Sequence, residues 1–132
     1  MIFEQIEGAF TLHQFFKKNR LRLEEKVIKS IFARIVRGVI HLHSEGIAHR
    51  DLKPDNILLG FDDDGEMIVK IIDLGFATTN KVGDLQCGTP NFMAPELTEK
   101  KTKYCPFKAD CWALGVLLFY LFEGRYPFRG MD

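Results

Sequence analysis

Apolar residues recur every three or four positions between Arg22 and His43, and this is the most regular pattern along the chain. The repeating positions are Val27, Ile28, Ile31, Phe32, Ile35, Val36, Val39 and Ile40. This spacing predicts a long helix that buries one stripe of side chains. Gly46 lies just beyond the stretch, where a glycine favours the left-handed cap that ends a helix. We interpret the stripe as core packing rather than as a cofactor-binding surface.

A second buried helix is predicted from the apolar run between Cys111 and Phe122, which Gly115 alone interrupts. The helix is expected to open in the segment 108–116 and to end at Gly124. Its apolar run is shorter than the roughly 20 residues that a membrane-spanning helix needs. We therefore predict a core helix and no membrane partner.

The first part of the chain carries weaker signals. Met1–Phe3 is predicted to end a strand, and residues 4–8 to form a connector that turns at Gly8. Thr11 is a favoured N-cap residue for the short helix predicted to begin there. His13 lies in that helix without a second ligand at metal-binding spacing, so we interpret it as a solvated histidine.

A hairpin is predicted in the middle of the chain. The strands Ile57–Leu59 and Met67–Ile72 flank an acidic loop that contains the turn sequence Asp64-Gly65. The acidic loop lacks the ligand spacing of an EF-hand, because Ile71 stands where the glutamate is required. A surface turn is therefore the better interpretation.

Composition narrows the class of protein. The chain has 132 residues, enough for one core, and its 18 basic and 18 acidic residues cancel, so no nucleic-acid partner is expected. The three cysteines are an odd number and form no Cys-x-x-Cys pair, which favours a reducing compartment. Residues 1–4 show no basic region followed by an apolar stretch, so no secretory signal is expected. We expect a mainly α protein with a small β-hairpin, in the cytoplasm with the nucleus as an alternative; nothing indicates an oligomeric state.

Four polar residues near the hairpin form the candidate chemistry: Asp51, Lys53, Asn56 and Asp73. Phosphoryl transfer needs a carboxylate for the proton of the attacking hydroxyl and a positive charge near the transferred group. It also needs oxygen ligands for magnesium, which a carboxylate and an amide supply. The four residues fit these requirements, with Asp51 as the base, Lys53 as the charge, and Asn56 with Asp73 as the metal ligands.

The motifs around these residues resemble those of eukaryotic serine/threonine protein kinases. The run His-Arg-Asp-Leu-Lys-Pro-Asp-Asn at residues 49–56 is similar to their catalytic loop. Residues 73–75, Asp-Leu-Gly, resemble their magnesium motif, with leucine in place of phenylalanine, and residues 94–96, Ala-Pro-Glu, resemble the end of their activation segment. The resemblance implies a partial protein-kinase-like fold, the C-terminal large lobe, spanning residues 1–132 as one domain.

The same resemblance implies roles for individual residues. Asp51, Lys53 and Thr89 are the expected catalytic residues, and Asn56 and Asp73 the expected magnesium ligands. ATP and Mg²⁺ are the expected cofactors, and a protein serine or threonine is the expected substrate. The residues expected around ATP are Glu4 and Ile6 in the hinge, Leu58 under the adenine, and Lys53, Asn56 and Asp73 near the phosphates.

Three further residues have supporting roles in the family. His49 is expected to brace the magnesium loop, and Arg50 to pair with a phosphorylated residue of the activation segment. Asp110 is expected to accept hydrogen bonds from the catalytic-loop backbone; the alternative is that it caps the first turn of its own helix.

Activation by phosphorylation is less clear from the sequence. Leu85 stands where many relatives carry a phosphorylatable threonine. Two hypotheses remain open: Thr78 or Thr79 is modified instead, or Asp84 supplies a constant negative charge to Arg50.

Parts of a kinase domain have no counterpart in the sequence. No glycine-rich loop and no strand lysine of the Val-Ala-Ile-Lys type is found. We therefore expect a partial domain that starts at the hinge and has little activity alone. The alternative function is a catalytically inactive, truncated kinase-like module that binds a partner.

Overall fold

The computed structural model describes residues 8–84, 86–98 and 103–128. Across these ranges the chain forms four α-helices, two single-turn 3-10 helices and three short strands. In chain order they are β1 (Phe10–Thr11), α1 (Leu12–Lys18), α2 (Glu25–Ser44), η1 (Pro54–Asn56), β2 (Ile57–Phe61), β3 (Met67–Ile71), η2 (Pro90–Phe92), α3 (Pro95–Thr98) and α4 (Pro106–Glu123). The prediction of a mainly α protein with a small hairpin is confirmed for these ranges. The predicted strand at Met1–Phe3 lies outside them.

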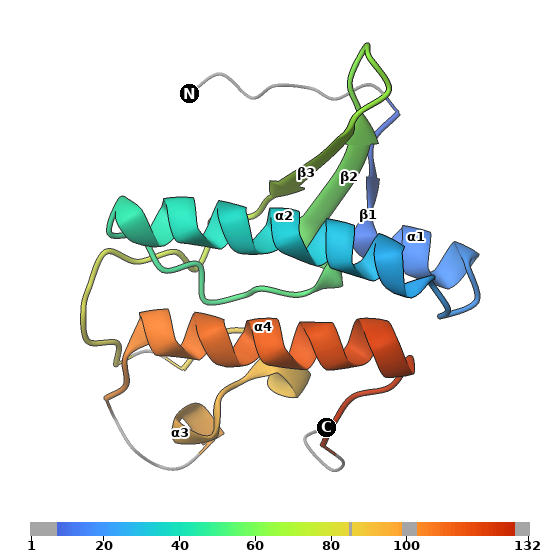
Figure 1. The fold of residues 1–132 in the computed structure, drawn as a ribbon. Helices are drawn as coiled ribbons and strands as arrows, with labels where there is room; N and C mark the ends of the chain where they lie inside the picture. The colour runs from blue at the N-terminus through green and yellow to red at the C-terminus, as the bar shows by residue number, and fades with distance from the viewer. Residues whose placement is uncertain (1–7, 85, 99–102, 129–132) are drawn as a thin grey trace.

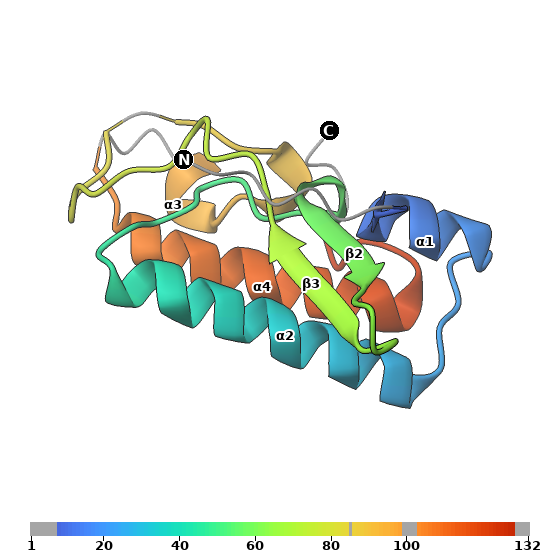
Figure 2. The same cartoon turned by 90° about the horizontal axis from the view of Figure 1, so that it is seen from above.

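Helices α2 and α4 lie side by side and run in opposite directions, and the sheet stands against the other side of α2 (Figures 1 and 2). Both helices bury apolar side chains on their facing surfaces, and α1 closes one end of the layer. The fully buried members of this core include Leu12, Phe16, Ile28, Ile31, Ile35, Leu52, Ile57, Leu117 and Leu121.

Helix α2 confirms the predicted stripe but is shorter than expected. It begins at Glu25 rather than Arg22, because its N-cap, Glu24, has an extended backbone with φ of −63° and ψ of 144°. Arg20 and Leu21 adopt left-handed backbone angles, with φ of 57° and 59°. The buried residues of α2 are Ile28, Ile31, Ile35 and Val39. Ile40 was predicted in the stripe but is 61% exposed. It follows Val39 by about 100° around the helix, which takes it out of the buried sector.

The end of α2 confirms the predicted glycine cap. Gly46 has a φ of 75°, and its N–H donates to the His43 carbonyl at 3.0 Å. The Ile47 N–H donates to the Leu42 carbonyl at 2.9 Å, which completes a Schellman arrangement. The cap turns the chain sharply into the segment that carries the candidate site.

The sheet contains the predicted hairpin and one strand that the sequence did not indicate. Strands β2 and β3 pair antiparallel with Ile57 opposite Ile71, and the loop between them turns at Gly65, with φ of 79°. Asp62 Oδ1 accepts hydrogen bonds from the N–H groups of Asp64 and Glu66 at 3.0 and 2.8 Å, so this carboxylate organises the loop. Strand β1 adds to the other edge of β2, giving the order β1-β2-β3.

Helix α1 begins where the sequence predicts. The Gln14 N–H donates to Thr11 Oγ1 at 3.1 Å, and the Thr11 N–H donates to Gln14 Oε1 at 2.9 Å. This reciprocal pair is a capping box, which satisfies two backbone donors at the helix start. The N-cap prediction for Thr11 is therefore confirmed.

Helix α4 begins two residues before the predicted opening, because Pro106 occupies its first turn, where proline is well tolerated. It ends as predicted at Gly124, which has a φ of 69° and donates its N–H to the Tyr120 carbonyl at 2.8 Å. Among the described residues, no helix combines the length and apolar character that a bilayer crossing requires.

Candidate active site

The start of the catalytic-loop segment, residues 49–56, is fixed by hydrogen bonds from its backbone to one buried carboxylate, that of Asp110. Asp110 in α4 is 1% exposed. Its Oδ2 accepts from the His49 N–H at 2.8 Å and its Oδ1 accepts from the Arg50 N–H at 2.9 Å. The structure therefore confirms that Asp110 holds the backbone of this loop. A buried carboxylate without such donors would be strongly unfavourable.

A third contact to Asp110 was missed by the sequence reasoning. His43 Nε2 lies 2.8 Å from Asp110 Oδ2, and the His43 ring packs edge-on against Phe107 at 5.0 Å. His43 and Asp110 are 67 residues apart, and neither carries a local signal of the pairing. His41, two residues earlier, is exposed, whereas His43 turns inward.

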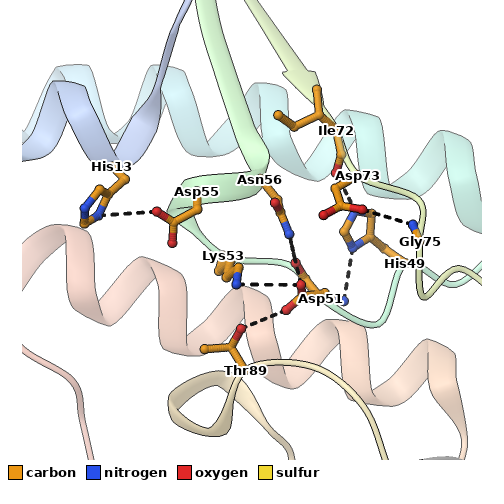
Figure 3. Close-up of polar contacts among 10 residues, drawn as sticks. All are labelled: His13, His49, Asp51, Lys53, Asp55, Asn56, Ile72, Asp73, Gly75 and Thr89. Atoms are coloured by element: carbon orange, nitrogen blue, oxygen red, sulfur yellow. Dashed lines mark hydrogen bonds and ion pairs between the residues drawn. The ribbon is translucent and has the colours of Figure 1, made fainter.

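His49 joins the catalytic loop to the end of β3. Its Nδ1 accepts from the Asp51 N–H at 3.1 Å, and Nε2 lies 2.9 Å from the Ile72 carbonyl (Figure 3). Because Nδ1 is an acceptor, the proton is on Nε2, which donates to that carbonyl. The buried imidazole thus fixes the chain immediately before Asp73, as expected of a bracing residue.

The carboxylate of Asp51 is the centre of the site (Figure 3). Thr89 Oγ1 donates to its Oδ1 at 2.9 Å. Asn56 Nδ2 donates to its Oδ2 at 3.2 Å and to its backbone carbonyl at 2.8 Å, and Lys53 Nζ lies 3.7 Å from Oδ2. Asp51 is 8% exposed, so these donors stabilise a nearly buried anion. Four predicted residues that lie up to 38 positions apart therefore meet.

Asn56 and Asp73 carry side-chain oxygen atoms that could hold a hard cation. Because Asn56 uses Nδ2 to bind Asp51, its Oδ1 is oriented away as an acceptor. The Ile72 N–H donates to the Asn56 carbonyl at 2.9 Å, which brings Asp73 beside Asn56 at the strand end. Asp73 is exposed and has a φ of 62°, and its Oδ1 accepts from the Gly75 N–H at 3.1 Å.

These two oxygen-bearing side chains fit magnesium, which prefers oxygen ligands and takes few of them from protein. Among the described residues, no group of three or more His, Cys, Asp or Glu forms a metal cluster. An amide and a carboxylate could hold magnesium together with the oxygen atoms of a phosphate-bearing ligand.

Of the remaining residues predicted to contact the nucleotide, the structure describes Leu58 but not Glu4 and Ile6. Leu58 lies in β2 and is half-buried, on the face opposite its neighbours Ile57 and Leu59. Glu4 and Ile6 lie outside the described residues. His13 Nδ1 lies 3.8 Å from Asp55 Oδ1 beside the catalytic loop, so the solvated histidine has an acidic neighbour.

Arg50 is engaged by neutral groups. Its Nε donates to the Phe76 carbonyl at 2.6 Å, and its Nη1 donates to the Tyr104 hydroxyl at 3.2 Å. No ion pair joins Asp84 to Arg50 within the described ranges, so the constant-charge hypothesis gains no support. Burial raises the pKa of Tyr104, so its hydroxyl stays protonated at neutral pH.

Two glycines allow close approaches by the segment between Asp73 and Glu96, which corresponds to the activation segment of kinases. Gly88, next to Thr89, has a φ of 107°, and a Cβ there would lie 2.8 Å from the Arg50 carbonyl oxygen. Gly83 faces the Tyr104 ring, where a Cβ would lie 2.7 Å from Cζ. Only glycine fits both positions without a shift of the backbone or ring.

A buried, hydrogen-bonded aspartate with an adjacent lysine, beside an amide and a carboxylate for magnesium, is the arrangement of a phosphotransferase of the protein kinase class. The sequence agrees with this class. The chain matches the protein kinase domain family over residues 1–132, and it belongs to that family. This confirms the resemblance found in the motifs.

Individual relatives place it in the serine/threonine branch. The chain is 48% identical over 109 residues to the serine/threonine-protein kinase ksp1 of Schizosaccharomyces pombe, covering 80% of this chain and 23% of that protein. It is 33% identical over 138 residues to the serine/threonine-protein kinase stk11 homolog of Dictyostelium discoideum, covering 100% of this chain and 23% of that protein. It is 37% identical over 132 residues to the CBL-interacting serine/threonine-protein kinase 15 of Arabidopsis thaliana, covering 97% of this chain and 30% of that protein.

The chain thus spans about a quarter of the length of these curated relatives, between 23% and 30%. The matched portion contains the candidate site described above.

Proposed function

We propose that this chain carries the catalytic loop of an ATP-dependent serine/threonine protein kinase. The reaction transfers the terminal phosphoryl group of ATP to a serine or threonine hydroxyl of a protein substrate. The observation that carries the proposal is the Asp51 carboxylate, which is nearly buried and held at both oxygens by Thr89 and Asn56.

Asp51 is the proposed proton acceptor. Each carboxylate oxygen accepts one hydrogen bond from the protein and retains a further lone pair for the substrate hydroxyl. Thr89 and Asn56 fix the direction of those lone pairs, which orients the attacking oxygen. The proton of that hydroxyl passes to Asp51 as the new phosphorus–oxygen bond forms and the bond to the leaving phosphate oxygen breaks.

Lys53 supplies the positive charge near the transferred group. Its ammonium lies 3.7 Å from Asp51 Oδ2 and its side chain is 25% exposed, so it is held beside the base. A fixed cation in a site with little water stabilises the charge that spreads over the phosphoryl oxygens. Asn56 and Asp73 are the proposed magnesium ligands; the metal, when bound, neutralises the phosphate charge and orients the nucleotide.

The proposal extends to the rest of the nucleotide site. Leu58 is the proposed floor under the adenine, and Glu4 and Ile6 its proposed backbone partners. By this assignment the chain belongs to the large lobe and acts with ATP and a protein substrate in the cytoplasm or nucleus. The mainly α architecture with a hairpin beside the catalytic loop supports the lobe assignment.

Magnesium-dependent ATP binding distinguishes this proposal from a catalytically inactive binding module. Thermal unfolding of the native polypeptide, purified from its own cells, is measured with ATP and with or without Mg²⁺. ATP at about 100 times its dissociation constant stabilises the folded state by about 2.7 kcal/mol. We expect this stabilisation to need Mg²⁺ and to be lost in Asp73→Asn.

Asp63→Asn is the matched control, because Asp63 is an exposed carboxylate of the hairpin loop outside the site. It removes the same charge and is expected to leave the stabilisation unchanged. If ATP and Mg²⁺ stabilise neither the wild type nor the control, the inactive module is the better account.

A further inference from the structure

The surface at the end of α1 carries four basic residues that form no ion pair in the described part of the chain. Lys17 and Lys18 form the last turn of α1, and Arg20 and Arg22 follow in the next turn of chain. All four side chains belong to exposed residues. Among the described residues, no ion pair involves any of them. Residues 17–22 therefore present four cations and no carboxylate.

The adjacent basic residues behave differently. Lys26 Nζ lies 3.5 Å from Glu24 Oε2, and Lys29 Nζ lies 2.6 Å from Glu25 Oε1. The hydrogen bond from Lys29 lowers the pKa of Glu25. The basic residues between Lys17 and Lys29 therefore fall into two groups: the lysines at the start of α2 are paired with glutamates, and the basic residues of segment 17–22 form no ion pair in the described residues.

An apolar pocket opens beside segment 17–22. Its volume is about 460 Å³, and it is lined by Phe10, Gln14, Phe15, Lys18 and Asn19. The Phe10 and Phe15 rings lie 5.6 Å apart at an angle of 34° and form its apolar wall. The volume lies in the range of ligand sites, roughly 300–1,000 Å³. Lys18 belongs to both the pocket and the cationic segment.

Hydrogen bonds fix the backbone turn that carries the two arginines. Arg20 and Leu21 have left-handed φ angles of 57° and 59°, which side-chain-bearing residues adopt only at a cost. The Leu21 N–H donates to the Phe16 carbonyl at 2.9 Å, and the Arg22 N–H donates to the Asn19 carbonyl at 3.1 Å. A turn fixed in this way loses little conformational entropy when a ligand binds.

We propose that this surface, formed by Lys17, Lys18, Arg20, Arg22 and the Phe10–Phe15 pocket, binds an acidic segment of a partner protein. The four cations attract carboxylates, and the pocket receives one apolar side chain of the segment. A concave pocket suits an inserted side chain, whereas binding to a membrane surface uses protruding apolar residues. The surface lies at the opposite end of the molecule from α3 in both views (Figures 1 and 2). Binding there goes beyond phosphoryl transfer and does not require it.

Fluorescence anisotropy with a defined probe tests this proposal. The probe is a fluorescein-labelled peptide in which glutamates flank a single central leucine, added to the purified protein. We expect Lys17→Gln combined with Lys18→Gln to weaken binding about tenfold. Lys26→Gln combined with Lys29→Gln removes the same charge from paired lysines and should change binding by less than about twofold.

Two further measurements, made on the unaltered protein, distinguish the contribution of the positive charge to binding from that of the pocket. Binding should weaken as ionic strength rises from about 0.01 M to about 0.15 M, because the screening length falls from roughly 30 Å to roughly 8 Å. Replacing the leucine of the probe by serine should weaken binding about tenfold, because the pocket contact is lost. Circular dichroism establishes that each variant is folded.

Three results would overturn the proposal. One is an equal loss of binding in both lysine pairs, and another is unchanged binding of the serine probe. The third is tighter binding of poly(U) RNA or of phosphatidylserine vesicles than of the peptide, through the same Lys17 and Lys18. The assay contains no ATP, so its outcome is independent of whether the chain supports phosphoryl transfer.

Discussion

At the scale of single residues, Asp110 has the largest structural role in the site. Its buried carboxylate accepts the N–H groups of His49 and Arg50 and contacts His43 Nε2. These are charge-assisted hydrogen bonds, and they fix the loop from which Asp51 projects. Loss of Asp110 should therefore affect both the fold and the geometry of Asp51.

Asp110→Asn is expected to lower the free energy of unfolding by about 3 kcal/mol. The amide keeps one acceptor oxygen but turns a donor group toward one of the three nitrogens, which leaves that buried contact unsatisfied. Urea denaturation measures the change. Asp63→Asn, in the exposed hairpin loop, should stay within about 0.5 kcal/mol of the wild type. Equal stability of the two variants would contradict the role given to Asp110.

Gly88 makes a second prediction at this scale. Gly88→Ala should destabilise the protein by about 2 kcal/mol, because its φ is 107° and the new Cβ would lie 2.8 Å from the Arg50 carbonyl oxygen. Gly115→Ala is the control, because Gly115 is in the interior of α4 and a Cβ added there would meet nothing within 4 Å. That variant should gain about 0.5–1 kcal/mol of stability from helix propensity. Thermal unfolding should show a lower stability than the wild type for Gly88→Ala and a higher one for Gly115→Ala. A stability change of the same sign in both variants would contradict the close approach assigned to Gly88.

At the scale of elements, local signals determine where α1 begins. Thr11→Ala removes the side-chain acceptor for the Gln14 N–H and should cost about 1 kcal/mol. Thr11→Ser keeps the hydroxyl and should cost markedly less. Urea denaturation of the two variants tests the cap, and equal losses would assign the effect to packing of the threonine methyl group instead.

Elements encoded by neighbouring residues were predictable from the sequence. The N-cap at Thr11, the stripe of α2 and the glycine caps at Gly46 and Gly124 each depend on residues within a few positions of one another. The start of α2 was predicted three residues early, because its N-cap, Glu24, is not a residue type that favours this position and makes no side-chain cap hydrogen bond.

Contacts between distant segments were predictable only in part. The pairing of β1 with β2 joins Phe10 to Leu59, and a strand of two residues gives no periodic signal. Asp51, Lys53, Asn56 and Asp73 were identified because the motifs name them, and the structure adds how Asp51 is held. The contacts of His43 with Asp110 and of Arg50 with Tyr104 depend on tertiary packing, and the kinase motifs do not include these pairs.

At the scale of the whole molecule, two core helices and a small sheet support the catalytic loop. The polar side chains of this loop gather around the Asp51 carboxylate (Figure 3). Asp110 in α4 holds the loop, His49 joins it to the end of β3, and Thr89 donates a hydrogen bond to Asp51. Each part comes from a different element. The proposed reaction therefore depends on the packing of α2, α4 and the sheet as well as on the motif residues.

Transfer of phosphate to a peptide tests the central claim most directly. The native polypeptide and its Asp51→Asn and Asp63→Asn variants, each purified from its own cells, are incubated with radiolabelled ATP, Mg²⁺ and a serine/threonine peptide library. We expect Asp63→Asn to match the wild type, and Asp51→Asn to lower the rate about 100-fold or more, because the proton acceptor is lost. Label should appear on serine or threonine. An Asp51→Asn variant that transfers phosphate at the wild-type rate would contradict the assignment of Asp51 as the base.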